Sequence, residues 1–112
     1  MNKLEQLVEY DFHDSLLEYI LYDECNKKVL LKIDFCNWKQ NWYNESEEET
    51  SMISLVFNNT SELVLPEHRL NSDEIIEFEV STDNRVRIVI FNDIEDTSHE
   101  IIINAETVEI IK

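Results

Sequence analysis

His13 and Asp14, adjacent in the segment Asp11-Phe12-His13-Asp14-Ser15, are the residues whose types most directly suggest chemistry. An imidazole beside a carboxylate can supply two neighbouring ligands to a divalent metal ion, as in metal-dependent phosphohydrolases. Such a site needs further ligands, but His68 and His99 fall in predicted loops, and there is no i,i+4 histidine pair and no Cys-x-x-Cys. We therefore expect Asp14 and Ser15 to hydrogen-bond backbone groups where a helix leads into a strand, with a metal or catalytic role as the alternative.

Paired carboxylates carry little information in this chain because acidic residues are so dense that pairs arise by chance. Asp34, Glu77, Glu79 and Glu109 are predicted to point outward from strands, as a solvated face or, alternatively, as a glycosidase-like pair of acids. The run 92–96 lacks the glycine and the ligand spacing of a dedicated calcium loop. We expect no catalytic residue, no cofactor and no bound metal.

The segment 38–49 is more distinctive, since it places both tryptophans of the chain, Trp38 and Trp42, beside the densest run of glutamates. Aromatic anchors surrounded by charge are typical of tight protein interfaces. Trp42 and Tyr43 fit an interface anchor and a core position equally well. Trp38 is expected in the core, at an open end of the fold.

The elements that must position these residues are mostly strands. Residues 2–10 place Leu4, Leu7 and Val8 at helical spacing behind Asn2 as a cap, which predicts a short amphipathic helix. Alternating or continuous apolar segments predict about eight short strands. Their ranges are 16–24, 28–35, 52–57, 61–66, 73–80, 85–91, 100–105 and 107–112, with 36–50 as a long connection and 92–100 as an acidic turn.

This pattern predicts a mainly β fold in a single domain spanning residues 1–112, either an antiparallel β-sandwich or a partly open barrel with the helix over an edge or end. The strand at 85–91 is apolar on both faces and should be central in its sheet. Cys25 and Cys36 fall near opposite ends of the first hairpin, too far apart for a disulfide, and are expected to be reduced.

The chain contains no glycine. Phosphate-cradling loops, the dinucleotide-binding fingerprint and the nucleophile elbow all need backbone without a Cβ, so these mechanisms are excluded. Turns with positive φ must then use Asn and Asp, which tolerate the left-handed region best among the other residues.

The net charge is −16, from nine Lys and Arg against twenty-five Asp and Glu. Residues 45–112 hold four of these bases against seventeen of the acids, so the negative field belongs to the later part of the chain. Nucleic acids and anionic membranes would be repelled, and we expect neither as a partner. A basic protein is the expected partner, and the absence of a signal-like N-terminus predicts a cytoplasmic protein.

Two short stretches, Phe12-His13-Asp14-Ser15 and Ile33-Asp34-Phe35-Cys36-Asn37-Trp38, resemble small cytoplasmic proteins of Gram-positive bacteria of the YxiG-like kind. These look like immunity proteins encoded beside secreted contact-dependent toxins. The resemblance implies no catalytic residues, and it transfers the two stretches only as structural signatures. It implies a stoichiometric inhibitor that presents carboxylates to the basic active site of a toxin, for example a nuclease.

Under this hypothesis the partner-binding residues are two aromatic anchors and seven acids. They are Trp42, Tyr43, Glu45, Glu47, Glu48, Glu49, Asp93, Glu95 and Asp96. The alternatives are a non-catalytic interaction module or oligomeric subunit, for which an exposed edge strand and a self-complementary patch would be expected, and a small metal-dependent enzyme or ligand-binding barrel. The sequence does not fix the oligomeric state.

Overall fold

The computed structural model describes residues 3–40, 42–44, 48–66 and 73–112, and within these ranges the chain is mainly β. In chain order the elements are η1 (Leu4–Glu9, a 3₁₀ helix), β1 (Leu16–Asp23), β2 (Lys28–Cys36), η2 (Asn37–Lys39, a 3₁₀ turn), β3 (Thr50–Asn58), β4 (Glu62–Val64), β5 (Asp73–Ser81), β6 (Arg85–Asn92), β7 (Thr97–Asn104) and β8 (Thr107–Ile111). The eight strands form one antiparallel sheet in the order β4-β7-β6-β5-β1-β2-β3-β8. The predicted mainly β class is confirmed.

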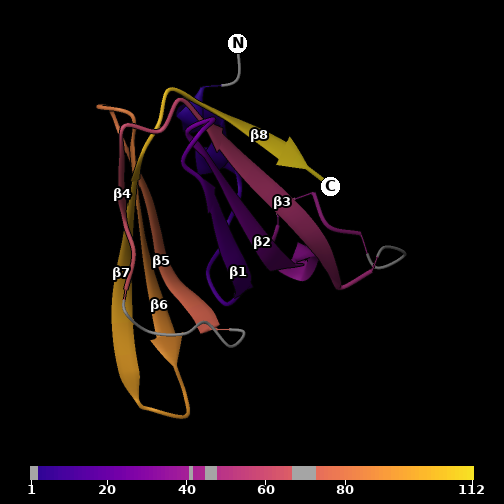
Figure 1. Cartoon of the computed structure of the whole chain (residues 1–112). Coiled ribbons are helices and arrows are strands. Elements are labelled where there is room, and N and C mark those ends of the chain that lie inside the picture. The colour runs from indigo at the N-terminus through magenta and orange to yellow at the C-terminus, as the bar shows by residue number, and fades with distance from the viewer. Residues whose placement is uncertain (1–2, 41, 45–47, 67–72) are drawn as a thin grey trace.

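The sheet curls so that its two ends meet. β3 pairs with β8, β4 pairs with β7, and the chain runs directly from β3 into β4 and from β7 into β8. Between these ladders Ser61 N donates to Asn104 O at 2.8 Å and Glu106 N donates to Asn58 O at 3.1 Å. The half formed by β1, β2, β3 and β8 therefore faces the half formed by β5, β6, β7 and β4, as Figure 1 shows. Of the two predicted architectures, the structure is therefore the partly open barrel and not the sandwich.

The opening of the barrel lies between β1 and β5. These strands share two residue pairs, Leu16 with Glu74 and Leu17 with Asp73, and a register irregularity follows on each strand. Such bulges bend a strand and end its pairing with a neighbour. Buried apolar side chains of η1 and of the segment that follows it, including Phe12, pack into the core at this opening, where η1 contacts β5.

Strand periodicity places the core as predicted. In β2 the buried residues are Val29, Leu31, Ile33 and Phe35, which alternate with partly exposed ones. β6 lies between β5 and β7 and buries Val86, Ile88 and Ile90 on one face, which confirms that it is central. Asp34, Glu77, Glu79 and Glu109 all point away from the core and are partly or fully exposed, also as predicted.

Two local predictions are wrong, and one falls on a residue that the structure does not describe. Val8 is 69% exposed because η1 is a 3₁₀ helix, whose three residues per turn place Leu4 and Leu7 on one face and turn Val8 away. The proposed cap, Asn2, lies outside the described residues. His99 lies in β7 and not in a loop, because the β6–β7 ladder continues through polar residues to the Asn92–Thr97 pair and shortens the acidic turn to 93–96.

Positive φ angles occur, in the described part of the chain, at Asp14, Lys27, Asn59, Asn84 and Asp96. Four of these five residues are Asn or Asp, as the absence of glycine predicts, and Lys27 is the exception. The cysteines are unpaired as predicted, with Cys25 exposed and Cys36 buried. Within the same described ranges, no helix has the length and apolar character needed to cross a membrane.

Candidate functional site

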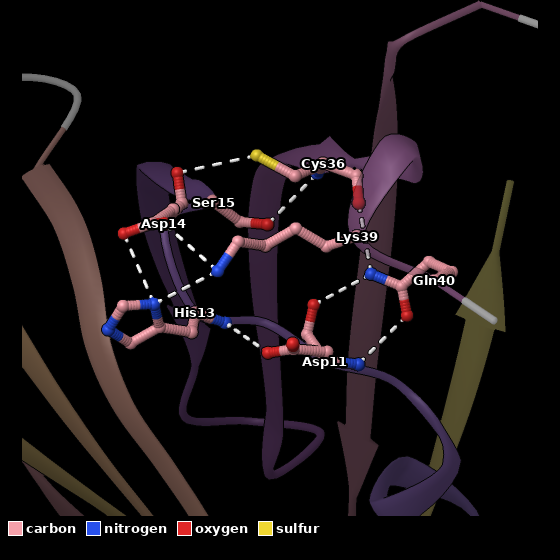
Figure 2. A network of polar contacts seen from close by, with 7 residues as sticks. All are labelled: Asp11, His13, Asp14, Ser15, Cys36, Lys39 and Gln40. Atoms are coloured by element: carbon pink, nitrogen blue, oxygen red, sulfur yellow. Dashed lines mark hydrogen bonds and ion pairs between the residues drawn. The ribbon is translucent and has the colours of Figure 1, made fainter. Parts of the chain in front are cut away.

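Two segments that are distant in sequence meet at one end of the barrel. The segment 11–15 enters β1 there, and the segment 36–40 leaves β2. Buried Ser15 accepts a hydrogen bond at its Oγ from Cys36 N at 3.0 Å, and Cys36 Sγ donates to Asp14 O at 3.4 Å (Figure 2). The predicted backbone hydrogen bond of the Ser15 side chain is confirmed. We call this end, with the described residues of the connection 37–49 and the turn 93–96, the site end.

The Gln40 side chain links the two segments through hydrogen bonds. Its Nε2 donates to Asp11 O at 2.8 Å and to Cys36 O at 2.9 Å, while its Oε1 accepts from Asp11 N at 2.9 Å (Figure 2). A buried amide can satisfy backbone donors and acceptors at once, which neither a carboxylate nor an ammonium can do. Sequence reasoning missed Gln40, because a single glutamine in a polar connection gives no periodic signal.

The Asp14 carboxylate bonds side chains rather than backbone, so that half of the prediction is wrong. Its Oδ2 lies 2.9 Å from Lys39 Nζ and its Oδ1 lies 3.2 Å from His13 Nδ1, and these two nitrogens are 3.2 Å apart (Figure 2). The left-handed backbone of Asp14, with φ at 71°, turns the chain between the opening and β1. The cluster therefore holds one carboxylate between two basic groups.

A second carboxylate, Glu74 on β5, joins this cluster across the barrel opening. A hydrogen bond shared with Glu74 and one from Lys39 lower the pKa of Asp14 below 3.8. The same shared hydrogen bond, burial and the charges of Asp14 and Asp93 raise the pKa of Glu74 above 4.5. Burial raises the pKa of the Cys36 thiol, and the hydrogen bond to Asp14 raises that of Lys39. At neutral pH the thiol and the amine are both protonated, and neither is prepared for nucleophilic attack.

This carboxylate pair makes stability depend on pH. The raised pKa of Glu74 contributes stability that is complete below pH 4.5 and is lost as the pH rises through that raised value. The lowered pKa of Asp14 contributes stability that is present above pH 3.8 and is lost as the pH falls through that lowered value. Glu74→Gln removes the repulsion and keeps a hydrogen-bond donor. We expect it to raise the melting temperature by about 1–4 °C at pH 7 and to have no effect at pH 4.

Thermal unfolding of the Glu74→Gln variant followed by circular dichroism from pH 4 to 8 measures this effect. Glu62→Gln, at an exposed position of β4, is the control for loss of one negative charge. Equal shifts in the two variants at every pH would contradict the carboxylate pairing.

The predicted partner-binding residues lie at the site end wherever they are described. Glu48, Glu49, Asp93, Glu95 and Asp96 are exposed, and Tyr43 is half-buried. Glu45 and Glu47 lie outside the described residues. β2 ends, β3 begins, β6 ends and β7 begins at this same end of the sheet, as the strand registers show. The Asp93 charge acts on Glu74, which links the β6–β7 turn to the carboxylate pair.

Both tryptophans lie on the surface of the connection that follows β2. Trp38 is 50% exposed, so its predicted core position is wrong, and Trp42 is 42% exposed. Phe12, Phe35 and Phe57 fill the interior instead, and no tryptophan is needed there. Each indole has an ammonium over its ring: Lys39 Nζ lies 5.6 Å from the Trp38 centroid, and Lys112 Nζ lies 5.1 Å from that of Trp42.

In the described ranges, 3–40, 42–44, 48–66 and 73–112, no three His, Cys, Asp or Glu side chains are grouped so that they could hold a metal ion. His68 falls outside these ranges. Comparison with protein-family models, with curated proteins and with solved structures finds no match.

Proposed function

We propose that the protein is a non-catalytic, stoichiometric binding protein of the cytoplasm that neutralises a basic partner, such as a toxin domain, by covering its active site. The observation that carries this proposal is the exposed Trp42 on a connection that also holds the glutamates at 48 and 49. Covering an exposed tryptophan with a partner removes a large apolar area from water and so favours binding, and tryptophan is among the residues most often found at the energetic centres of interfaces.

Charge supports a basic partner. The chain carries a net charge of −16, and exposed acids lie on two separate loops of the site end. A concentrated negative field attracts a basic surface over long range and raises association rates by roughly 10- to 1000-fold at low ionic strength. Carboxylates at such a surface can occupy positions where a nuclease would bind phosphates.

The resemblance to immunity-type proteins is consistent with this proposal. Its two stretches, around Phe12–Ser15 and Ile33–Trp38, are joined through the contacts of Cys36 with Ser15 and Asp14. They include Trp38 and lead into the connection that carries Trp42. The protonated states of Cys36 and Lys39 favour this structural role over nucleophilic catalysis.

Neutralising the acid run tests the electrostatic part of the proposal. Replacing Glu45, Glu47, Glu48 and Glu49 by glutamine should slow association with the basic partner about threefold to tenfold at low salt and flatten the salt dependence. Stopped-flow kinetics between about 20 mM and 500 mM salt measures this effect.

The matched control removes the same number of negative charges near the opposite end of the barrel, by glutamine at Glu24, Glu62, Glu106 and Glu109. All four are exposed. If both variants slow association equally, net charge and not the site end is responsible, and the assignment of the acid run to the interface is wrong.

The partner itself is obtained by pull-down from native lysate at about 0.1 M and 1 M salt with mass spectrometry. The purified partner is then titrated with the protein while its own activity is measured. We expect a basic partner that is released at high salt, and inhibition that is complete at a fixed molar ratio. A partner that retains full activity when saturated would contradict inhibition.

A second candidate function, a subunit that associates with its own kind, is favoured by the outer face of β1, β2, β3 and β8. Tyr19, Leu21, Met52 and Ile111 on this face are 42%, 58%, 49% and 51% exposed. The register also places Leu21 beside Leu30, which extends the apolar surface. Exposed apolar side chains gathered on one face of a sheet are a feature of interaction sites. A concentration-dependent dimer in light scattering, with this face protected from hydrogen exchange, would move the conclusion to this candidate.

A further inference from the structure

An open cleft of about 440 Å³ on the surface brings together residues from three distant parts of the chain. Its lining residues are Glu9, Tyr10, Trp42 and Lys112. Lys112 Nζ lies 5.3 Å from the centroid of the Tyr10 ring and 5.1 Å from that of Trp42. Both distances are within the range of cation–π attraction, so the cleft already holds an ammonium group between two aromatic rings.

The first wall of the cleft is fixed by the core. The Tyr10 ring packs against Phe12 and Phe35, with centroid distances of 6.0 Å and 5.9 Å. The second wall, Trp42, is 42% exposed, and Lys112 is an exposed residue next to the last residue of β8. The aromatic wall is thus built into the fold, whereas the ammonium comes from a flexible four-carbon side chain that a ligand can displace.

We propose that this cleft binds a cationic side chain, arginine or lysine, of the basic partner, and that Lys112 occupies the same position in the free protein. The inference rests on the proposed function, because a basic partner supplies the ligand. The two ring faces and the Glu9 carboxylate are complementary to a positive charge. An arginine suits the site well, since its planar guanidinium is more weakly hydrated than an ammonium and stacks on aromatic faces.

Competition between Lys112 and the ligand sets the size of the expected effect. Each cation–π contact at an exposed site favours the state with the Lys112 ammonium in the cleft about twofold to fivefold. The two rings together therefore favour that state roughly fivefold to thirtyfold. A ligand then meets an empty cleft in only a small fraction of molecules, and its apparent affinity is reduced by that fraction. Removing the ammonium of Lys112 should therefore tighten ligand binding by about fivefold or more.

The test uses N-acetyl-arginine amide as the probe and the fluorescence of Trp42 as the signal, in a Trp38→Phe background that leaves one indole. We expect Lys112→Met to bind the probe at least about fivefold more tightly than the background protein. N-acetyl-citrulline amide, which has nearly the same shape without the charge, should not bind. Tyr10→Leu, added to Lys112→Met, should remove most of the gain.

The matched control is Lys32→Met, which also removes one positive charge and one cation–π contact, since Lys32 Nζ lies 5.9 Å from the Tyr19 centroid on the outer face. An equal gain in both variants would show a bulk charge effect and overturn the proposal. Absence of saturable binding in Lys112→Met, with an unchanged circular dichroism spectrum, would overturn it too.

These outcomes are separable from failure of the proposed function. If the cleft binds no arginine but the acid-run variant still slows association, the binding function stands and the cleft is not its contact point. If the cleft binds arginine but association with a basic partner does not depend on the acid run, the cleft is confirmed as a cation site and the proposed function is wrong.

Discussion

Replacing Phe12 by alanine is expected to lower the free energy of unfolding by about 3–5 kcal/mol. The Phe12 side chain is 2% exposed and stacks on Phe78 with ring centroids 4.2 Å apart, and it also contacts Phe35 at 5.4 Å. It connects β2 to β5 at the opening where β1 and β5 share two residue pairs. A cavity here cannot be closed by strand pairing, so the loss should fall in the upper part of the range for a buried aromatic ring.

Urea unfolding followed by tryptophan fluorescence and circular dichroism measures this loss. Ile94→Ala is the control, because Ile94 is 82% exposed in the β6–β7 turn and its truncation should change stability by less than about 0.5 kcal/mol. A change below about 1 kcal/mol in the Phe12 variant would show that the opening is not sealed by this ring.

Replacing Trp42 by alanine is expected to weaken binding of the basic partner by about 30-fold or more, which corresponds to about 2 kcal/mol. The exposed indole provides one of the largest apolar areas at the site end, and it forms one wall of the cleft that holds Lys112. Titration calorimetry with the purified partner measures the effect. Because the side chain is not part of the core cluster, the fold should be retained.

Leu21→Ala is the control for Trp42→Ala. Leu21 is 58% exposed on β1, on the outer face that would serve the alternative of self-association. Weakening by Leu21→Ala but not by Trp42→Ala would contradict the site end as the docking surface and would favour the outer face of the sheet. Equal weakening by both would require an interface larger than the site end.

The strands were predictable because their signal is local. Apolar residues at every second position in β2 and β6 define an inner and an outer face without knowledge of the partner strands. The turns were predictable for a similar reason, since a chain without glycine must use residues such as Asn59 and Asn84 at positive φ. The positive φ of Lys27 was not predicted, because the hairpin ladder on either side of the turn imposes this conformation.

The site was less predictable because its contacts are long-range. Nothing local in the sequence pairs Asp14 with Glu74 or Gln40 with Asp11. Glu74 comes near Asp14 because β5 pairs with the start of β1, and Gln40 comes near Asp11 because the β1–β2 ladder places the segment after β2 beside the segment before β1. The sequence favours a core position for Trp38, as a cap over an open end of the fold. The interior was instead filled by phenylalanines, and an indole carried on η2 remained outside.

The long-range ladders that close the barrel affect the folding kinetics. The ladder between β3 and β8 joins residues such as Phe57 and Val108, and that between β1 and β5 joins Leu16 and Glu74. Contacts of such large sequence separation slow folding, because the chain loses the entropy of closing long loops before the contacts can stabilise the fold. Hairpins such as β1–β2 can form while the chain is still being synthesised, but the barrel can close only after β8 has left the ribosome. Until then β3 presents an unpaired edge, and this interval is when the chain is most open to aggregation.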